Sequence, residues 1–105
     1  MKINALIIDD TDNVVTCVDE VSAGSEVCYR KGDEILSLKA LEDIPYCHKI
    51  ALKDFSEGDE VIKYGEMIGR TNTAVKKGGW LWDKNVYSVP RDYDSELVEV
   101  TGGKN

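Results

Sequence analysis

Apolar residues in this chain come in short runs of four to seven, and polar turns separate most of them. The runs are Ala5–Ile8, Val14–Val18, Glu26–Tyr29, Ile35–Leu38, Lys49–Leu52, Val61–Tyr64, Trp80–Val86 and Leu97–Val100. An amphipathic helix needs a longer segment with apolar residues at i, i+3, i+4 and i+7, and no such segment occurs. The pattern therefore predicts an all-β fold with at most one short helix, a turn over Leu38–Asp43 before Pro45.

Three segments repeat one arrangement of residues: Val21–Val27, Phe55–Val61 and Val75–Leu81. In each segment a glycine stands three positions after one apolar residue and three positions before the next. Glycine adopts the left-handed backbone conformation without steric cost, so these segments predict tight turns. The left-handed positions are Gly24, Gly58 and Gly78. Their uneven spacing argues against a solenoid and for one small domain with several similar turns.

The length of 105 residues allows one domain with a modest core. We expect this domain over residues 1–87 and a polar linker or tail over 88–105. The net charge of −7 repels phosphate backbones and anionic lipid surfaces, so nucleic acid is not an expected partner. The chain has no signal-like start and nothing that approaches a membrane span, so we expect a cytoplasmic protein without membrane contact.

The three cysteines, Cys17, Cys28 and Cys47, are odd in number and widely spaced. This spacing argues against a disulfide framework and against a zinc site, and we expect small buried residues in strands. The acidic residues Asp9, Asp10 and Asp12 resemble the opening of a calcium loop. The glycine and the closing glutamate of such a loop are missing, so a solvated turn is the better interpretation.

The single histidine, His48, stands between Cys47 and Lys49. Successive side chains of a strand point to opposite faces, so a catalytic pair of Cys47 and His48 is not expected. His48 is then either a structural residue or a group that transfers a proton or contacts a substrate. The alternating residues Trp80, Trp82 and Lys84 should share one side of a strand, as core and cover or as an interface anchor.

Residues 48–86 resemble the SAF module of altronate and galactarate dehydratases and the small subunits of related sugar-acid and sulfolactate lyases. The resemblance is carried by "HK" followed by "ALKD", by "EGDEVIKYGEMIGR", by a "KKG" turn and by "NV" at 85–86. Residues 1–47 agree more loosely. The resemblance implies a compact β-clip of short, bent strands, with Gly65 and Gly69 at sharp bends.

The resemblance also implies a site near one end of the clip, facing a catalytic protein. Its residues would be His48 as the catalytic group and, for the substrate, Lys49, Arg70, Lys84 and Asn85. Arg70 would hold a substrate carboxylate or pair with the partner, although a surface ion pair is an equal alternative. The family has two histidines where this chain has Trp82 and Lys84, so no role of that pair is carried over.

Dehydration of a sugar acid needs a base for the proton next to the carboxylate, and an acid or metal for the leaving hydroxide. This chain offers few such groups and no metal cluster. The resemblance therefore implies the small subunit of a split sugar-acid dehydratase, inactive without a large catalytic subunit that would hold any divalent metal, such as iron. The alternative is a non-catalytic carbohydrate- or protein-binding module. The acid, the group eliminated and a homo-oligomeric state stay open.

Overall fold

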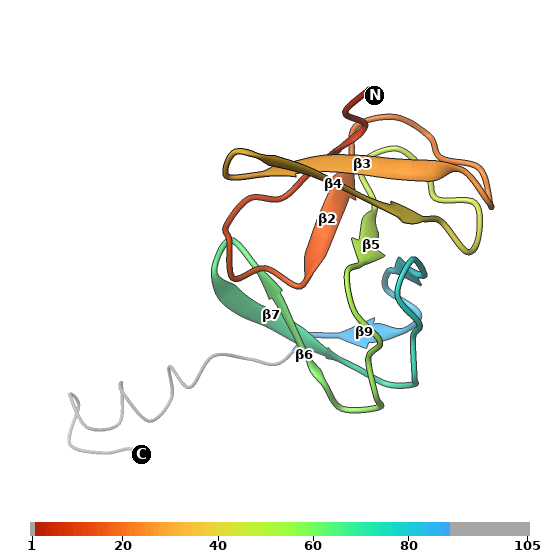
Figure 1. Cartoon of the computed structure of the whole chain (residues 1–105). Coiled ribbons are helices and arrows are strands. Elements are labelled where there is room, and N and C mark those ends of the chain that lie inside the picture. The colour runs from red at the N-terminus through yellow and green to blue at the C-terminus, as the bar shows by residue number, and fades with distance from the viewer. Residues whose placement is uncertain (1, 89–105) are drawn as a thin grey trace, which may run out of the picture.

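The computed structural model describes residues 2–88, which form nine β-strands and no helix (Figure 1). This confirms the all-β prediction. The strands are β1 (Ala5–Leu6), β2 (Val14–Cys17), β3 (Glu26–Lys31), β4 (Glu34–Lys39), β5 (Lys49–Ala51), β6 (Glu60–Lys63), β7 (Glu66–Thr71), β8 (Trp80–Leu81) and β9 (Val86–Tyr87).

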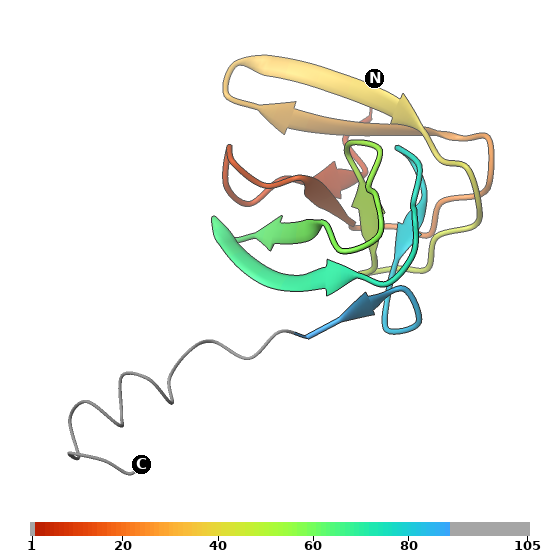
Figure 2. The same cartoon turned by 90° about the horizontal axis from the view of Figure 1, so that it is seen from below.

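The strands form three antiparallel units. A central four-stranded sheet has the order β1-β2-β5-β8, β3 and β4 form a hairpin, and a third sheet has the order β6-β7-β9. Both views place the β3–β4 hairpin and the β6–β7–β9 sheet on opposite sides of the central strands (Figures 1 and 2). The central sheet is therefore covered on both faces.

Two hydrophobic cores fill the spaces on either side of the central sheet. Neighbouring residues of β2 contribute to different cores, with Val15 in the first and Val14 in the second. In β5 the same alternation places Ile50 in the first core and Ala51 in the second. This follows from the two-residue repeat of a strand, and it explains why these strands read as continuous apolar runs.

Two asparagines attach the outer hairpins to the central sheet in the same way. The Asn4 side chain accepts from the Cys28 amide at 2.7 Å and donates to the Glu26 carbonyl at 3.1 Å, both in β3. The Asn13 side chain accepts from Ile62 at 2.8 Å and donates to Glu60 at 3.0 Å, both in β6. Each asparagine thus satisfies backbone groups at the outer edge of a hairpin strand.

Four tight turns of one geometry precede strands β3, β5, β6 and β8. Gly24, Gly58 and Gly78 have φ angles of 84°, 87° and 92°, which confirms the turns predicted at the three glycines. The fourth turn, Ile44–Lys49, has Cys47 at the same position with φ of 71°. In each turn a backbone hydrogen bond joins the first and fourth of the four turn residues, as in Ser22–Ser25. The residue with positive φ is the third of the four, as a type II turn requires.

The predicted helical turn over Leu38–Asp43 is wrong. Leu38 and Lys39 end β4, and the amides that follow bond to distant carbonyls: Ala40 to Ser25 and Leu41 to Gly78. These long-range bonds replace the local bonds that a helical turn would need. The continuous strand predicted over Trp80–Val86 is also wrong, because a turn separates β8 from β9.

The two glycines of "VIKYGEMIGR" have different roles. Gly65 is the second residue of the β6–β7 turn, where Tyr64 and Gly65 have φ of 60° and 72°, so the bend predicted there is confirmed. Gly69 lies inside β7 rather than at a sharp bend, beside a register shift. A Cβ at Gly69 would lie 2.5 Å from the Tyr87 carbonyl oxygen, so glycine permits the close approach of β9.

The predicted tail, with its strand at Leu97–Val100, lies outside the described residues except for Ser88. Within residues 2–88 no helix is long and apolar enough to cross a membrane.

Candidate functional site

His48 lies at the end of the turn that leads into β5, and its imidazole contacts Trp80 of β8. The indole Nε1 donates a hydrogen bond to His48 Nδ1 at 2.9 Å, and the two rings meet edge to face with centroids 5.3 Å apart. This contact is partly buried. Pairing of Ile50 with Trp80 in the central sheet brings the two side chains together.

Trp80, Trp82 and Lys84 form a continuous stack beside His48. The two indoles lie 4.0 Å apart at an angle of 10°, and the Lys84 ammonium lies 5.1 Å from the Trp82 ring centroid. The sequence placed these residues on one side of a strand. They do lie side by side, but a turn after Leu81 brings them together, not a continuous strand.

Asn85 shapes this turn with its side-chain amide. Its Oδ1 accepts from the Trp82 backbone amide at 2.8 Å, and its Nδ2 donates to the Trp80 carbonyl at 2.7 Å. Both ends of the Asn85 amide are therefore bonded within the chain. In this structure Asn85 holds the Trp80–Trp82 backbone.

Lys49 follows His48 directly, but its side chain lies on the opposite face of the central sheet. It pairs with Leu81, which belongs to the second core, whereas Trp80 packs against the first core. Burial lowers the pKa of the Lys49 ammonium, and the nearby Lys63 lowers it further, while Asp83 acts in the opposite direction. Lysines at binding and catalytic sites are often half-buried and have a lowered pKa.

Arg70 lies in β7, and its guanidinium is engaged by groups at the start of β6. It donates to the Gly58 carbonyl at 2.8 Å and forms an ion pair with Glu60 at 3.3 Å. The side chain keeps 38% of its surface exposed. The exposed part of this side chain is accessible to a ligand or a partner protein.

The predicted site residues therefore fall into three places. The structure connects His48 to Lys84 only through the two stacked tryptophans, since His48 contacts Trp80 and Lys84 contacts Trp82. Asn85 belongs to the same turn. Lys49 lies on the other face of the central sheet, and Arg70 lies in the third sheet. A single shared site for all five residues stays a prediction.

Asp12 holds the fold together with a carboxylate that the sequence analysis assigned to a solvated turn. Its carboxylate is buried and accepts the amides of Asp9 at 3.0 Å, Tyr64 at 3.2 Å and Gly65 at 2.8 Å. The interpretation as a solvated turn is thus wrong for Asp12, while Asp9 and Asp10 are exposed. The tip of the β6–β7 hairpin is more than fifty residues away in sequence, so no local signal indicated this contact.

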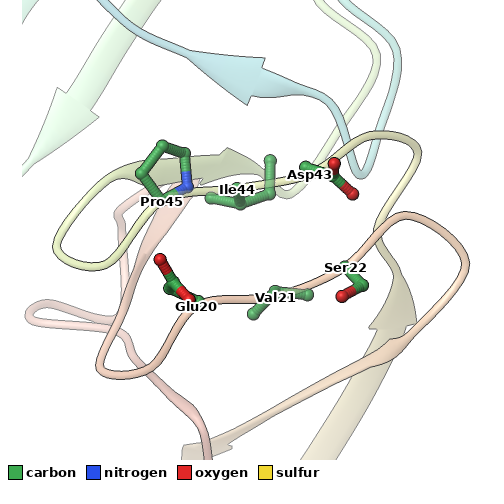
Figure 3. A pocket seen from close by; sticks show the side chains of 6 residues that line it. All are labelled: Glu20, Val21, Ser22, Asp43, Ile44 and Pro45. Carbon is green, nitrogen blue, oxygen red and sulfur yellow. The ribbon is translucent and has the colours of Figure 1, made fainter.

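A separate pocket of about 250 Å³ lies across the bridge between Val21 and Ile44 (Figure 3). It is lined by Glu20, Val21, Ser22, Asp43, Ile44 and Pro45. None of the predicted site residues lines it. Its two carboxylates would repel an anionic ligand, so it does not suit the carboxylate of a sugar acid.

The cysteines differ in exposure. Cys17 and Cys28 are buried in strands as predicted, and burial raises the pKa of the Cys17 thiol to about 11. Cys47 is exposed in a turn, which corrects the prediction of a buried strand residue. Within residues 2–88 the three thiols are free, and no group of three or more His, Cys, Asp or Glu side chains could hold a metal ion.

Comparison with known proteins gives a consistent family assignment. Residues 3–89 match the family model of the altronate/galactarate dehydratase SAF domain. The chain is 34% identical over 83 residues to galactarate dehydratase (L-threo-forming) of Escherichia coli, covering 79% of this chain and 15% of that protein. It thus spans less than a sixth of that relative's length.

Two shorter relatives are α subunits of (2R)-sulfolactate sulfo-lyase. The chain is 33% identical over 89 residues to the Chromohalobacter salexigens subunit, covering 82% of this chain and 95% of that subunit. It is 46% identical over 48 residues to the Paracoccus pantotrophus subunit, covering 46% of this chain and 72% of that subunit. With the strand architecture and the family match over residues 3–89, this chain belongs to the SAF domain family of the altronate and galactarate dehydratases.

Proposed function

We propose that this chain is the small subunit of a split sugar-acid dehydratase and forms the carboxylate-binding site together with a separate large catalytic subunit. The observation that carries the proposal is the match over 95% of a protein that is itself named as the α subunit of a lyase. The same module covers only 15% of galactarate dehydratase. The family thus contains the module both in a long chain and as a short chain.

Cations at three places in the fold support a role in binding an acid. Lys84 lies over the Trp82 ring, Lys49 is half-buried, and the side chain of Arg70 is partly exposed. The chain as a whole carries a charge of −7, so an anionic ligand needs these cations to offset the negative charge of the chain. A carboxylate is best held by such charge-assisted hydrogen bonds.

The chemistry of elimination supports a division of labour. Removing the proton next to a carboxylate needs a base, and the developing charge needs an acid or a metal ion. In this proposal the large subunit supplies the base and any divalent metal, such as iron. His48 and the cations of this chain complete the site from the other side.

The two α-subunit relatives favour a second candidate, a sulfo-lyase subunit acting on sulfolactate. Galactarate and sulfolactate are both hydroxy carboxylates, so a carboxylate site serves either reaction. A third candidate, a non-catalytic binding module for carbohydrate or protein, predicts no lyase activity in any complex.

The test is to produce the chain together with a large dehydratase-like polypeptide and to purify the complex. We expect the complex to convert one of altronate, galactarate or (2R)-sulfolactate, and the acid converted separates the first two candidates. The purified chain alone should convert none of them, with or without a divalent metal. Failure to form a complex, or a complex inactive on every acid, would contradict the proposal.

Substitutions then test the site within the active complex. His48→Ala and Arg70→Ala should lower kcat/KM by 10-fold or more, because each removes a charge-assisted or proton-bearing contact. Arg30→Ala is the matched control, since Arg30 is an exposed strand arginine in β3. If His48→Ala and Arg70→Ala both match the control, the predicted site is wrong even though the complex is active.

A further inference from the structure

Trp80 is held at both of its backbone groups and at its ring. Its backbone amide donates to Glu42 Oε2 at 2.9 Å, and its carbonyl accepts from Asn85 Nδ2 at 2.7 Å. Its indole is stacked on Trp82 and packs against the first core. A side chain held at both backbone groups and on its ring face is preorganised, so its N–H points in one direction.

The hydrogen bond from Trp80 determines the protonation pattern of His48. An indole N–H only donates, so His48 Nδ1 must be the acceptor and cannot carry a proton while this bond is made. In the neutral imidazole the proton is then on Nε2. The nitrogen that stays free for a ligand is therefore a hydrogen-bond donor, and the lone pair that a base would need is occupied.

We propose that Trp80 is a positioning residue that holds His48 in its Nε2–H tautomer, so that His48 donates a hydrogen bond to a carboxylate or hydroxyl oxygen of the substrate. The tautomer stands on the structure of this chain alone, whereas the substrate oxygen rests on the proposed function. His48 then stabilises negative charge on oxygen and does not remove a proton from carbon. The base must come from the large subunit.

The tautomer can be measured directly because His48 is the only histidine of the chain. Long-range ¹H–¹⁵N spectra of the isolated ¹⁵N-labelled chain, recorded well above the usual titration range of imidazole, give one pair of ring nitrogens. We expect Nδ1 at an unprotonated shift and Nε2 at a protonated shift. A proton on Nδ1, or an average of both tautomers, would overturn the assignment.

Two tryptophan variants show whether Trp80 sets this pattern. Trp80→Phe keeps an aromatic ring on Trp82 but removes the N–H, so the two nitrogen shifts should move toward an average of both tautomers. Trp82→Phe is the matched control, because Trp82 stacks on Trp80 without bonding to His48, and it should leave the shifts unchanged. Unchanged shifts in Trp80→Phe would overturn the role of Trp80.

Activity of the complex separates a donor from a base. The glutamine amide places an N–H near the position of histidine Nε2, so His48→Gln should keep more activity than His48→Ala, by about 5-fold or more. Trp80→Phe should lower kcat by about 5- to 10-fold, the effect of one lost hydrogen bond. If His48→Gln is as inactive as His48→Ala while the measured tautomer is Nε2–H, the donor role is wrong, although the proposed function still holds.

Discussion

Two turns of this molecule have the same backbone conformation, but the side chain of the residue that closes each turn bonds within the turn in one case and outside it in the other. In Phe55–Glu60 the Asp59 amide donates to the Ser56 carbonyl at 3.0 Å, and in Ile44–Lys49 the His48 amide donates to the Pro45 carbonyl at 3.1 Å. The position before Asp59 is Gly58 and the position before His48 is Cys47, both with positive φ. Asp59 and His48 are thus equivalent residues.

The difference begins one hydrogen bond away. The Asp59 carboxylate turns back to accept the Ser56 amide at 2.8 Å and so closes its own turn. The equivalent residue of the other turn is Pro45, which has no amide proton to donate. A side chain at position 48 therefore has no amide to bond at position 45, and His48 bonds to Trp80 instead. Because Pro45 lacks an amide proton, the His48 side chain is free to bond outside its own turn.

The largest effect that this comparison predicts is at Gly78, the third residue of the turn before β8. Gly78 has φ of 92°, and a Cβ there would overlap the carbonyl oxygen of Lys39. Gly78→Ala should lower the free energy of unfolding by about 3–5 kcal/mol, from backbone strain and overpacking together. Urea denaturation measures the loss. A loss no larger than that of Gly58→Ala would show that the clash relaxes.

A smaller effect is expected at Gly58, where no heavy atom lies within 4 Å of an added Cβ. Gly58→Ala should lower the free energy of unfolding by about 1 kcal/mol, because alanine is strained at φ of 87° but loses less entropy on folding. Gly24→Ala is the matched control, with φ of 84° and equally open space, and it should lose the same amount. A tolerated alanine at both positions would contradict the strain argument.

Cys47→Gly tests the same backbone strain in the opposite direction, because here the substitution should raise the free energy of unfolding. Cys47 is exposed and has φ of 71°, so glycine relieves the backbone and removes little packing. We expect the free energy of unfolding to rise by about 0.5–1 kcal/mol, and Cys47→Ala to stay within about 0.5 kcal/mol of the original chain. Urea denaturation under reducing conditions measures both variants. A less stable glycine variant would mean that the Cys47 side chain makes a stabilising contact.

The turns also show what the sequence could and could not predict. Three of the four were predicted, because glycine marks a left-handed residue whatever its neighbours are. The fourth turn was not predicted because the motif was defined by its glycine, and this turn has Cys47 at that position. The spacing I-x-x-C-x-K at Ile44–Lys49 matches V-x-x-G-x-E at Val21–Glu26, and this is the signal that could have found it.

Contacts that depend on distant residues were beyond sequence reasoning. The amides bound by Asp12 and the carbonyl that excludes a Cβ at Gly69 come from segments that only the folded sheet brings near. The resemblance supplied His48 as a site residue, but its link to Trp80 spans 32 positions and depends on the pairing of β5 with β8. Residue types suggest chemistry, whereas partners follow from topology.

The smallest predicted effect concerns pH and the carboxylate that closes the Phe55–Glu60 turn. The backbone hydrogen bond from Ser56 lowers the pKa of Asp59 below its ordinary value of 3.8, and Lys53 and Arg70 lower it further. Since the folded-state pKa is the lower one, the stabilisation is complete above the unfolded-state pKa. It is lost as the pH falls through the folded-state pKa.

Asp59→Asn should therefore be less stable than the original chain near pH 6, and the difference should shrink once the pH falls below 3.8. Urea denaturation of both proteins across this range measures the difference. Ser25→Asn offers a matched control, because it alters the equivalent position of the Val21–Glu26 turn, where the side chain carries no charge. Its difference from the original chain should not shrink as the pH falls below 3.8. A constant difference for Asp59→Asn would mean that the charge of Asp59 does not close the turn, and the contrast with His48 would then rest on Pro45 alone.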